Sequence, residues 1–403
     1  MQGSEQVKTR DLFDKCRDFT RATEVKNSGF YPYFNPISSA AANVVKINGQ
    51  ELIMIGSNNY LGLTTHPKVI EASIEAVKKY GTGCTGSRFL NGTLDIHIEL
   101  EEKLAEFMHK EAVLVFSTGF QTNLGTISCL VGKNDLILAD RSDHASIVDG
   151  CRLSFGKTLK YRHNDMGDLE RILQSDAAED ANILVVVDGV FSMEGDIVDL
   201  PRLVDLKKKY GFRLLVDDAH SIGVLGSDGS GTASHFGLAE DVDMTMGTFS
   251  KSFASIGGVI AADAYVIDYI KHLSRPMIFS AALPPSAVAT VLECLRIIQA
   301  EPERREQLWK NGNKMREGFT SMGFNIGAST TPIIPVYIGE DMACFKFWKA
   351  LYDAGIFANA IIAPAVTPGN ALIRTSYTAT HTEEQLDFVL ETFEKVGKHL
   401  NII

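Results

Sequence analysis

The sequence contains no cysteine pair with the spacing of a metal site or a redox motif. Its six cysteines are scattered, and none forms a C-x-x-C pair: Cys16, Cys84, Cys129, Cys151, Cys294 and Cys344. This pattern argues against a zinc site and a disulfide framework, and it favours a reducing compartment. Positive charge is not in excess either, because the formal net charge is -11. Nucleic acid is therefore not expected as a partner.

Long apolar runs are also missing. No uninterrupted apolar stretch is long enough to span a bilayer, and the first 21 residues lack the apolar core of a signal peptide. With 45% hydrophobic and 22% charged residues, the composition is that of an ordinary soluble globular protein. We therefore expect a cytoplasmic location.

The 403 residues suffice for two or three folding units. We expect an N-terminal arm over residues 1–59, a large domain over 60–285 and a smaller α+β domain over 286–403. The arm should begin with an amphipathic helix over residues 1–25, whose apolar face carries Val7, Leu12, Phe13, Cys16 and Phe19. Further helices are expected over 66–80 and, as one long helix, from about 286 to 322.

The middle of the chain alternates apolar, β-branched runs with helical stretches. The expected strands are residues 112–116, 135–139, 183–187, 213–216, 243–246 and 258–262. Such alternation predicts an α/β fold with a mostly parallel sheet and helices on both faces. Ligands of such sheets bind beyond the carboxyl ends of the strands.

Two glycine-containing segments match nucleotide-binding motifs only in part. Residues 81–86 fit G-x-G-x-x-G, but that fingerprint follows a strand, and a helix is expected before this one. Gly156-Lys157-Thr158 resembles the end of a P-loop, yet Cys151 stands where its first glycine belongs. We expect neither segment to bind a nucleotide.

One lysine stands out chemically. Lys251 lies between Ser250 and Ser252, after an apolar run and shortly before a glycine pair. A desolvated, deprotonated lysine at such a place forms a Schiff base with an aldehyde. Taken alone, the segment also fits a surface lysine in a serine-rich turn. The polar residues that follow the other expected strands favour the chemical interpretation.

Pyridoxal phosphate is the aldehyde that these residues fit. It needs a lysine, a carboxylate at its ring nitrogen, donors for its phosphate and a flat partner for its ring. Asp217 is the candidate carboxylate, since Asp218 must point to the opposite face of the strand. His220 could reach the phenolic oxygen, and His144 could stack on the ring. Candidates for the phosphate are Thr248, Ser250 and the backbone at Gly119 and Phe120.

The same residues admit other interpretations. Asp217 and His220 could be two metal ligands, although no third ligand has suitable spacing and Lys251 would then have no role. A single histidine at a strand end is often structural. Arg374 is expected to leave an apolar strand. It could be an ordinary surface cation, or its two-pronged guanidinium could bind an amino-acid carboxylate.

The chain resembles the α-oxoamine synthases, which are fold-type I pyridoxal phosphate enzymes with an aspartate-aminotransferase-like fold. The resemblance extends over nearly the whole chain and rests on residues 57–63 (SNNYLGL), residues 217–221 (DDAHS) and Arg374. Within the family, residues 247–255 (GTFSKSFAS) are similar to the soluble bacterial serine palmitoyltransferase branch. The resemblance implies pyridoxal phosphate as cofactor and a homodimer with shared active sites.

The resemblance also implies a role for each matching residue. Lys251 would hold the cofactor aldehyde and remove the α-proton, and Ser280 would reach over from the other subunit. The cofactor would be held by Gly119, Phe120, His144, Ser192, Asp217, His220, Thr248 and Ser250. Arg374 would bind the substrate carboxylate, assisted by Asn58 and Tyr60. Some relatives carry a second arginine where this chain has Ile361, Ile362 and Ala363.

The activity implied by the resemblance is decarboxylating condensation of L-serine with a long-chain acyl-CoA such as palmitoyl-CoA. The product would be 3-ketosphinganine, which starts sphingolipid synthesis, and peripheral association with the inner membrane is a further candidate property. The alternative within the family uses glycine or alanine, as in 2-amino-3-ketobutyrate CoA ligase or 8-amino-7-oxononanoate synthase. A non-catalytic partner subunit and a metal-dependent hydrolase are the alternatives from other classes.

Overall fold

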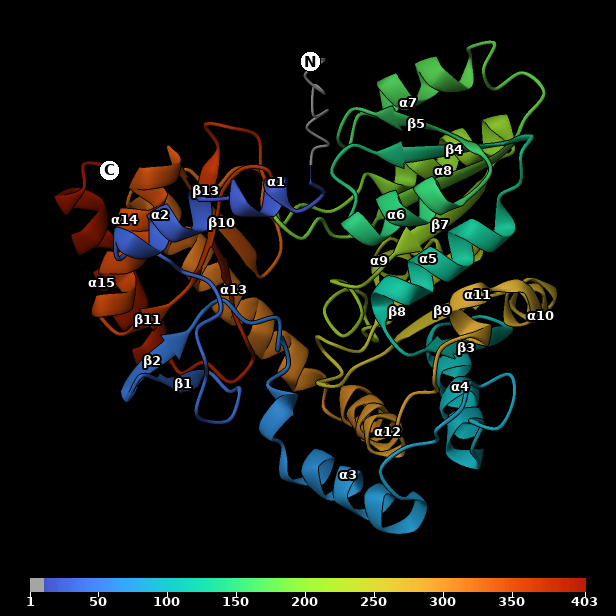
Figure 1. Cartoon of the computed structure of the whole chain (residues 1–403), viewed down its shortest axis with the longest axis horizontal. Coiled ribbons are helices and arrows are strands. Elements are labelled where there is room, and N and C mark those ends of the chain that lie inside the picture. The colour runs from blue at the N-terminus through green and yellow to red at the C-terminus, as the bar shows by residue number, and fades with distance from the viewer. Residues whose placement is uncertain (1–10) are drawn as a thin grey trace, which may run out of the picture.

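A seven-stranded sheet forms the centre of the larger part of the molecule (Figure 1). The computed structural model describes residues 11–403. The strand order is β3-β9-β8-β7-β6-β4-β5, and among these seven β9 runs in the direction opposite to the other six. The strands are β3 (Ala112–Phe116), β4 (Asp135–Asp140), β5 (Lys157–Tyr161), β6 (Asn182–Asp188), β7 (Arg213–Asp217), β8 (Met244–Thr248) and β9 (Gly258–Ala262).

Both faces of this sheet are buried, because successive side chains alternate between two hydrophobic cores. In β6, Val185 and Val187 belong to one core, whereas Leu184 and Val186 belong to the other. The helices α5 (Gly119–Leu130), α6 (Ala145–Leu153) and α10 (Ala264–Leu273) supply the core on the Leu184 side, and α7 (Met166–Leu173) and α8 (Leu200–Tyr210) supply the opposite one. Short elements complete this part: α9 (Thr232–His235), η2 (Ala239–Asp241) and α11 (Arg275–Ile278).

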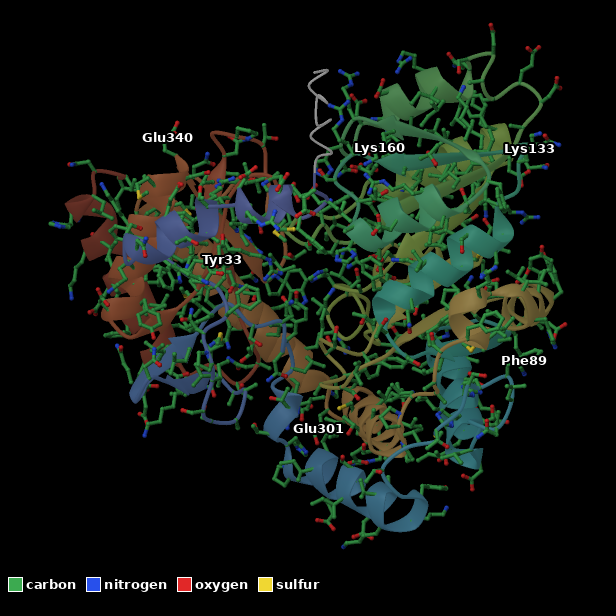
Figure 2. The ribbon with its side chains drawn as sticks, in the orientation of Figure 1. Tyr33, Phe89, Lys133, Lys160, Glu301 and Glu340 are labelled. Carbon is green, nitrogen blue, oxygen red and sulfur yellow. The ribbon has the colours of Figure 1, made fainter. Side chains whose placement is uncertain are left out.

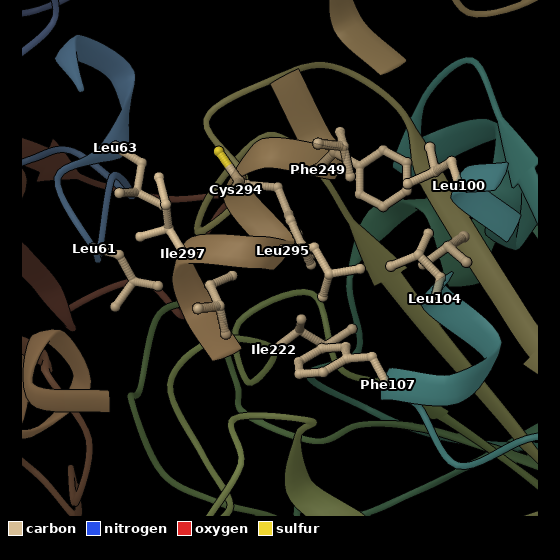
Figure 3. Close-up of a cluster of buried hydrophobic side chains, with 14 of the residues drawn as sticks. Leu61, Leu63, Leu100, Leu104, Phe107, Ile222, Phe249, Cys294, Leu295 and Ile297 are labelled. Carbon is tan, nitrogen blue, oxygen red and sulfur yellow. The ribbon is translucent and has the colours of Figure 1, made fainter. Parts of the chain in front are cut away.

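A third hydrophobic cluster lies between three helices and the face of β3 and β9 that α5 and α10 do not cover. The helices are α3 (Pro67–Tyr80), α4 (Asp95–Phe107) and α12 (Pro285–Ala300), preceded by the 3-10 turn η1 (Leu63–Thr65). Figure 3 shows Leu295 of α12 facing Leu104 and Phe107 of α4, while Ile297 of α12 lies on the side of Leu61 and Leu63. Burial of large apolar side chains of this kind stabilises each by about 1.5–3 kcal/mol relative to exposure.

A smaller unit lies at the other side of the molecule in Figure 1. Its antiparallel sheet has the order β10-β13-β12, and a second small sheet, β1-β2-β11, joins the N-terminal segment to it. The strands are β1 (Val44–Ile47), β2 (Gln50–Met54), β10 (Ile333–Gly339), β11 (Ile356–Phe357), β12 (Asn359–Ile361) and β13 (Ala371–Ser376). Three helices cover them: α13 (Pro302–Ser321), α14 (Asp341–Asp353) and α15 (Glu383–His399).

Charged side chains occupy the outside of both units. Figure 2 shows Lys133 and Lys160 projecting from the larger part and Glu340 from the smaller one, and all three are exposed. Among the helices of residues 11–403, none combines the length and the apolar character needed to cross a bilayer.

Two helix expectations were wrong. From residue 11 onward the N-terminal segment forms two short helices, α1 (Asp14–Arg17) and α2 (Arg21–Asn27), so one helix does not run through to residue 25. Leu12, Phe13 and Phe19 are exposed there, while Val7 lies outside the described residues. The expected long helix is interrupted at Glu301, labelled in Figure 2, because Pro302 cannot continue the hydrogen bonds of α12 and begins α13 instead.

Candidate active site

A cavity of about 290 Å³ lies at the carboxyl ends of β6, β7 and β8. Parallel strands present their ends at one edge of the sheet, so residues far apart in the sequence meet there. Nine of the predicted cofactor residues line it: Gly119, Phe120, His144, Ser192, Asp217, His220, Thr248, Ser250 and Lys251. The structure thus brings together in one place the residues selected from separate strand ends.

Lys251 follows β8 and lines this cavity. Loss of hydration in the cavity lowers the pKa of Lys251 to about 7, although Asp217 and Asp188 favour its charged form. Near neutral pH, a large fraction of this amine is therefore uncharged and nucleophilic. An exposed lysine would need a pH near 10.4 for the same fraction.

This lowered pKa predicts how cofactor capture depends on pH. The neutral amine attacks the aldehyde, and its fraction rises through the pKa, so the rate of pyridoxal phosphate uptake by cofactor-free protein should rise with an inflection near pH 7. Stopped-flow absorbance measures this rate, with free lysine as the reference. An inflection at the pH of the reference amine contradicts the proposed environment of Lys251.

Asp217 ends β7 on the face of the sheet that α5 covers. Its Oδ2 accepts a hydrogen bond from Asn123 Nδ2 at 2.6 Å, and its Oδ1 accepts one from the Ala219 backbone N–H at 2.9 Å. Asp218 points to the opposite face, as predicted, where Thr232 Oγ1 donates to it at 2.6 Å. The Asp217 carboxylate is therefore fixed before any ligand arrives.

His220 is buried beside Tyr60. Its Nδ1 lies 2.6 Å from the Tyr60 hydroxyl. Burial, together with the charges of Lys251 and Arg374, holds the pKa of His220 well below its ordinary value. Burial also raises the pKa of Tyr60 to about 12, so its hydroxyl stays protonated. Tyr60, predicted to contact substrate, thus contacts a cofactor-site histidine directly.

His144 begins α6 as its N-cap residue. Its Nδ1 accepts the Ser146 backbone N–H at 3.2 Å, and its own backbone N–H donates to Asp188 Oδ2 at 3.1 Å. Burial lowers the pKa of His144, although Asp217 opposes this effect. His144 is therefore held by hydrogen bonds both at its backbone N–H and at its ring.

The N-terminus of α5 and Thr248 form a close-packed cradle beside Lys251. A Cβ added at Gly119 would lie 2.6 Å from Thr248 Oγ1, so only glycine allows this approach. Thr248 Oγ1 also lies 3.1 Å from Ser250 Oγ. The first N–H groups of a helix have no partner within it, and together with hydroxyl groups they form a site for a phosphate.

Arg374 lies inside β13 and is only 4% exposed. The expectation that it leaves its strand was wrong, because the strand continues to Ser376 and pairs with β10 and β12 on both sides. Its Nε donates to the Ser192 backbone oxygen at 2.6 Å, and its Nη2 donates to Asn58 Oδ1 at 3.0 Å. Because Ser192 lines the cavity, the buried Arg374 guanidinium that bonds to it lies next to the cavity.

Ser280 does not line this cavity in the single chain. Its Oγ accepts a hydrogen bond from Gln121 Nε2 at 3.1 Å, and it borders a separate hollow that includes the exposed Phe155 and Phe279. The predicted contribution of Ser280 therefore depends on a second copy of the chain.

Three residues at the site escaped the sequence analysis. Asn123 and Ser146 lie inside helices, and Asp188 ends β6 directly beside Asp217 in the strand register. Burial, and then the neighbouring Asp217, raises the pKa of Asp188 well above its ordinary value. The position of Asp188 at a strand end was the one available signal. In residues 11–403, no group of three or more His, Cys, Asp or Glu side chains could hold a metal ion.

Comparison with known proteins identifies the family. The family model for aminotransferase class I and II matches residues 50–393. The chain belongs to this family. It is 52% identical over 391 residues to a serine palmitoyltransferase of Sphingobacterium spiritivorum, covering 97% of this chain and 98% of that protein. It is 45% identical to an 8-amino-7-oxononanoate synthase of Thermoanaerobacter pseudethanolicus, covering 94% and 96% respectively.

A solved structure agrees. A serine palmitoyltransferase from S. paucimobilis, with a bound adduct of pyridoxal phosphate and myriocin, has a TM-score of 0.94 and 36% identity, and the match covers 98% of this chain and 100% of that one. The predicted α-oxoamine synthase resemblance and the fold-type I architecture are thereby confirmed.

The cavity residues fit pyridoxal phosphate on chemical grounds. Lys251 supplies an amine with a lowered pKa, Asp217 supplies a preset carboxylate, and the cradle at Gly119 and Thr248 supplies donors for a phosphate. These are the groups that the cofactor requires.

Proposed function

We propose that the chain condenses L-serine with a long-chain acyl-CoA, with palmitoyl-CoA as the reference substrate. The products are 3-ketosphinganine, CoA and CO2, and pyridoxal phosphate is the cofactor. The observation that carries this proposal is the identity of about one half, over nearly the full length, to proteins named serine palmitoyltransferase. The chain is a pyridoxal phosphate-dependent acyltransferase, and Lys251 argues against a non-catalytic partner subunit.

In this proposal each residue of the cavity has a separate role in the reaction. Once bound, the cofactor accepts the electron pair that is left on the substrate α-carbon when its proton is removed. Lys251 would hold the cofactor aldehyde and would then serve as the base for that proton. Asp217 would keep the proton on the ring nitrogen, His220 would bind the phenolic oxygen, and His144 would support the ring.

The substrate carboxylate binds to Arg374 in this proposal. A guanidinium presents five N–H groups in a planar fork, and two of them already bond to the Ser192 backbone oxygen and to Asn58. Asn58 therefore orients Arg374 and does not simply add a further contact. Ile361, Ile362 and Ala363 offer no second cation, so this arginine is the principal carboxylate ligand.

A matrix of substrates tests the assignment. Serine, glycine and alanine are each combined with palmitoyl-CoA and acetyl-CoA, and release of CoA is measured. We expect kcat/KM for serine with palmitoyl-CoA to exceed every other combination by at least roughly tenfold, the discrimination that a few apolar or hydroxyl contacts provide. A higher value for alanine or glycine would favour the second candidate, an 8-amino-7-oxononanoate synthase-like or ligase-like activity, which the 45% identity supports.

The proposal includes a cytoplasmic homodimer with shared active sites. Ser280 from one copy then reaches the cavity of the other, and the exposed Phe155 and Phe279 beside it are covered by the partner. Peripheral contact with the inner membrane is part of the same proposal, because the acyl chain and the product are lipids.

A further inference from the structure

An unbroken row of hydrogen bonds joins Asp217 to His144. Asn123, buried in α5, donates from Nδ2 to Asp217 Oδ2 at 2.6 Å and to Ser146 Oγ at 2.9 Å. Ser146 Oγ lies 2.8 Å from His144 Nδ1, and the Ser146 backbone N–H also reaches this nitrogen, at 3.2 Å. Asn123 and Ser146 are 0% and 1% exposed, so water does not compete for these bonds.

The chemistry of the donors fixes the direction of each bond. A carboxylate only accepts, so Nδ2 and not Oδ1 of Asn123 must face Asp217, and its second N–H serves Ser146. The Ser146 oxygen then accepts from Asn123, which leaves its own proton to donate to His144. A backbone N–H only donates, so His144 Nδ1 is an acceptor and carries no proton.

We propose that Asn123 and Ser146 are positioning residues that lock His144 as the neutral tautomer protonated at Nε2, with its orientation tied to Asp217. His144 thus presents an N–H, and not a lone pair, to whatever lies in the cavity. A proton on Nδ1 would point at the Ser146 backbone N–H, which only donates, and would remove that bond; the Ser146 hydroxyl would also have to give up its donation to the ring. The inference rests on the proposed function for its catalytic meaning, although the tautomer itself does not depend on which acyl-CoA is used.

Other charged groups around His144 do not determine this tautomer. Asp188 from β6 binds its backbone N–H, Asp217 from β7 reaches it through Asn123, and Lys251 after β8 opposes its protonation electrostatically. Phe120 from α5 meets the ring edge-on, with ring centroids 6.4 Å apart. Ser146 is the one side chain that bonds to the ring nitrogen among the described residues.

The test is 15N NMR of histidine-labelled, full-length holoenzyme, with His144 assigned from His144→Gln. Wild type should show an unprotonated Nδ1 and a protonated Nε2 from pH 6 to 9. Ser146→Ala should give a mixture of tautomers and raise the midpoint of His144 by about one pH unit, the scale of one hydrogen bond. Asn123→Ala should move the spectrum in the same direction, and Ser146→Thr should restore it.

Ser128→Ala is the matched control, because it removes a hydroxyl from α5 that bonds only to the backbone of its own helix. It should leave the His144 signals unchanged. The wild-type spectrum decides the proposal even if a variant fails to fold, since a protonated Nδ1 would overturn it. Ser146→Ala and Asn123→Ala spectra identical to wild type would overturn it as well. Failure of the substrate assignment instead appears only in the CoA-release matrix.

Discussion

Lys251→Ala should lose turnover by roughly 10⁴-fold or more, and the purified protein should lose its visible absorption band. In the proposed function Lys251 is both the covalent anchor of the cofactor and the base for the α-proton, and general base catalysis alone contributes about 10²–10⁴-fold. Absorbance spectra and CoA release measure the two effects on the same sample.

Lys271→Ala is the matched control for this variant. Lys271 is an exposed lysine in the last turn of α10, and its loss should change neither colour nor rate. A Lys251→Ala protein that remains yellow and active would remove the basis of the proposed chemistry.

Asp217→Asn should still bind pyridoxal phosphate but should lose turnover by about 10²–10³-fold, the scale of one preset electrostatic contact. The amide carries no charge to hold a proton on the ring nitrogen. Its NH2 group would also face either Asn123 Nδ2 or the Ala219 N–H, which are both donors. Cofactor titration and steady-state rates separate binding from turnover.

Asp218→Asn is the contrasting neighbour. Asp218 is completely buried on the opposite face and bonds to the backbone and hydroxyl of Thr232. We expect it to destabilise the fold by about 1–3 kcal/mol and to leave the rate per folded molecule unchanged. If both variants had the same effect on turnover, the special role of Asp217 would be lost.

Six strands of the large sheet could be predicted because each of them has a buried apolar run. Six of the seven were located to within one or two residues, and the missing one, β5, is an edge strand. Its five residues include two exposed lysines, Lys157 and Lys160, and only Tyr161 is fully buried, so it has no continuous apolar signal. The break at Pro302 was missed although the sequence carries its signal, since proline is tolerated only in the first turn of a helix.

The convergence of the candidate site residues could be predicted where they stand at strand ends, and contacts that depend on helix packing were missed. Lys251, Asp217 and His220 follow strands, so their convergence follows from sheet topology. Asn123 lies within α5, and its contact with Asp217 depends on how that helix is rotated over the sheet. The pattern of apolar and polar residues along a helix does not fix that rotation precisely enough to predict a single hydrogen bond. The proposed part of Ser280 in the site requires a second chain, so the fold of one chain does not specify it.

The most direct test of the central claim is to reduce the holoenzyme with borohydride and to map the modified peptide by mass spectrometry. The account predicts one pyridoxyl group per chain, attached to Lys251 Nζ. A group on another lysine, or no attached group in a protein that still forms product from serine and palmitoyl-CoA, would contradict it.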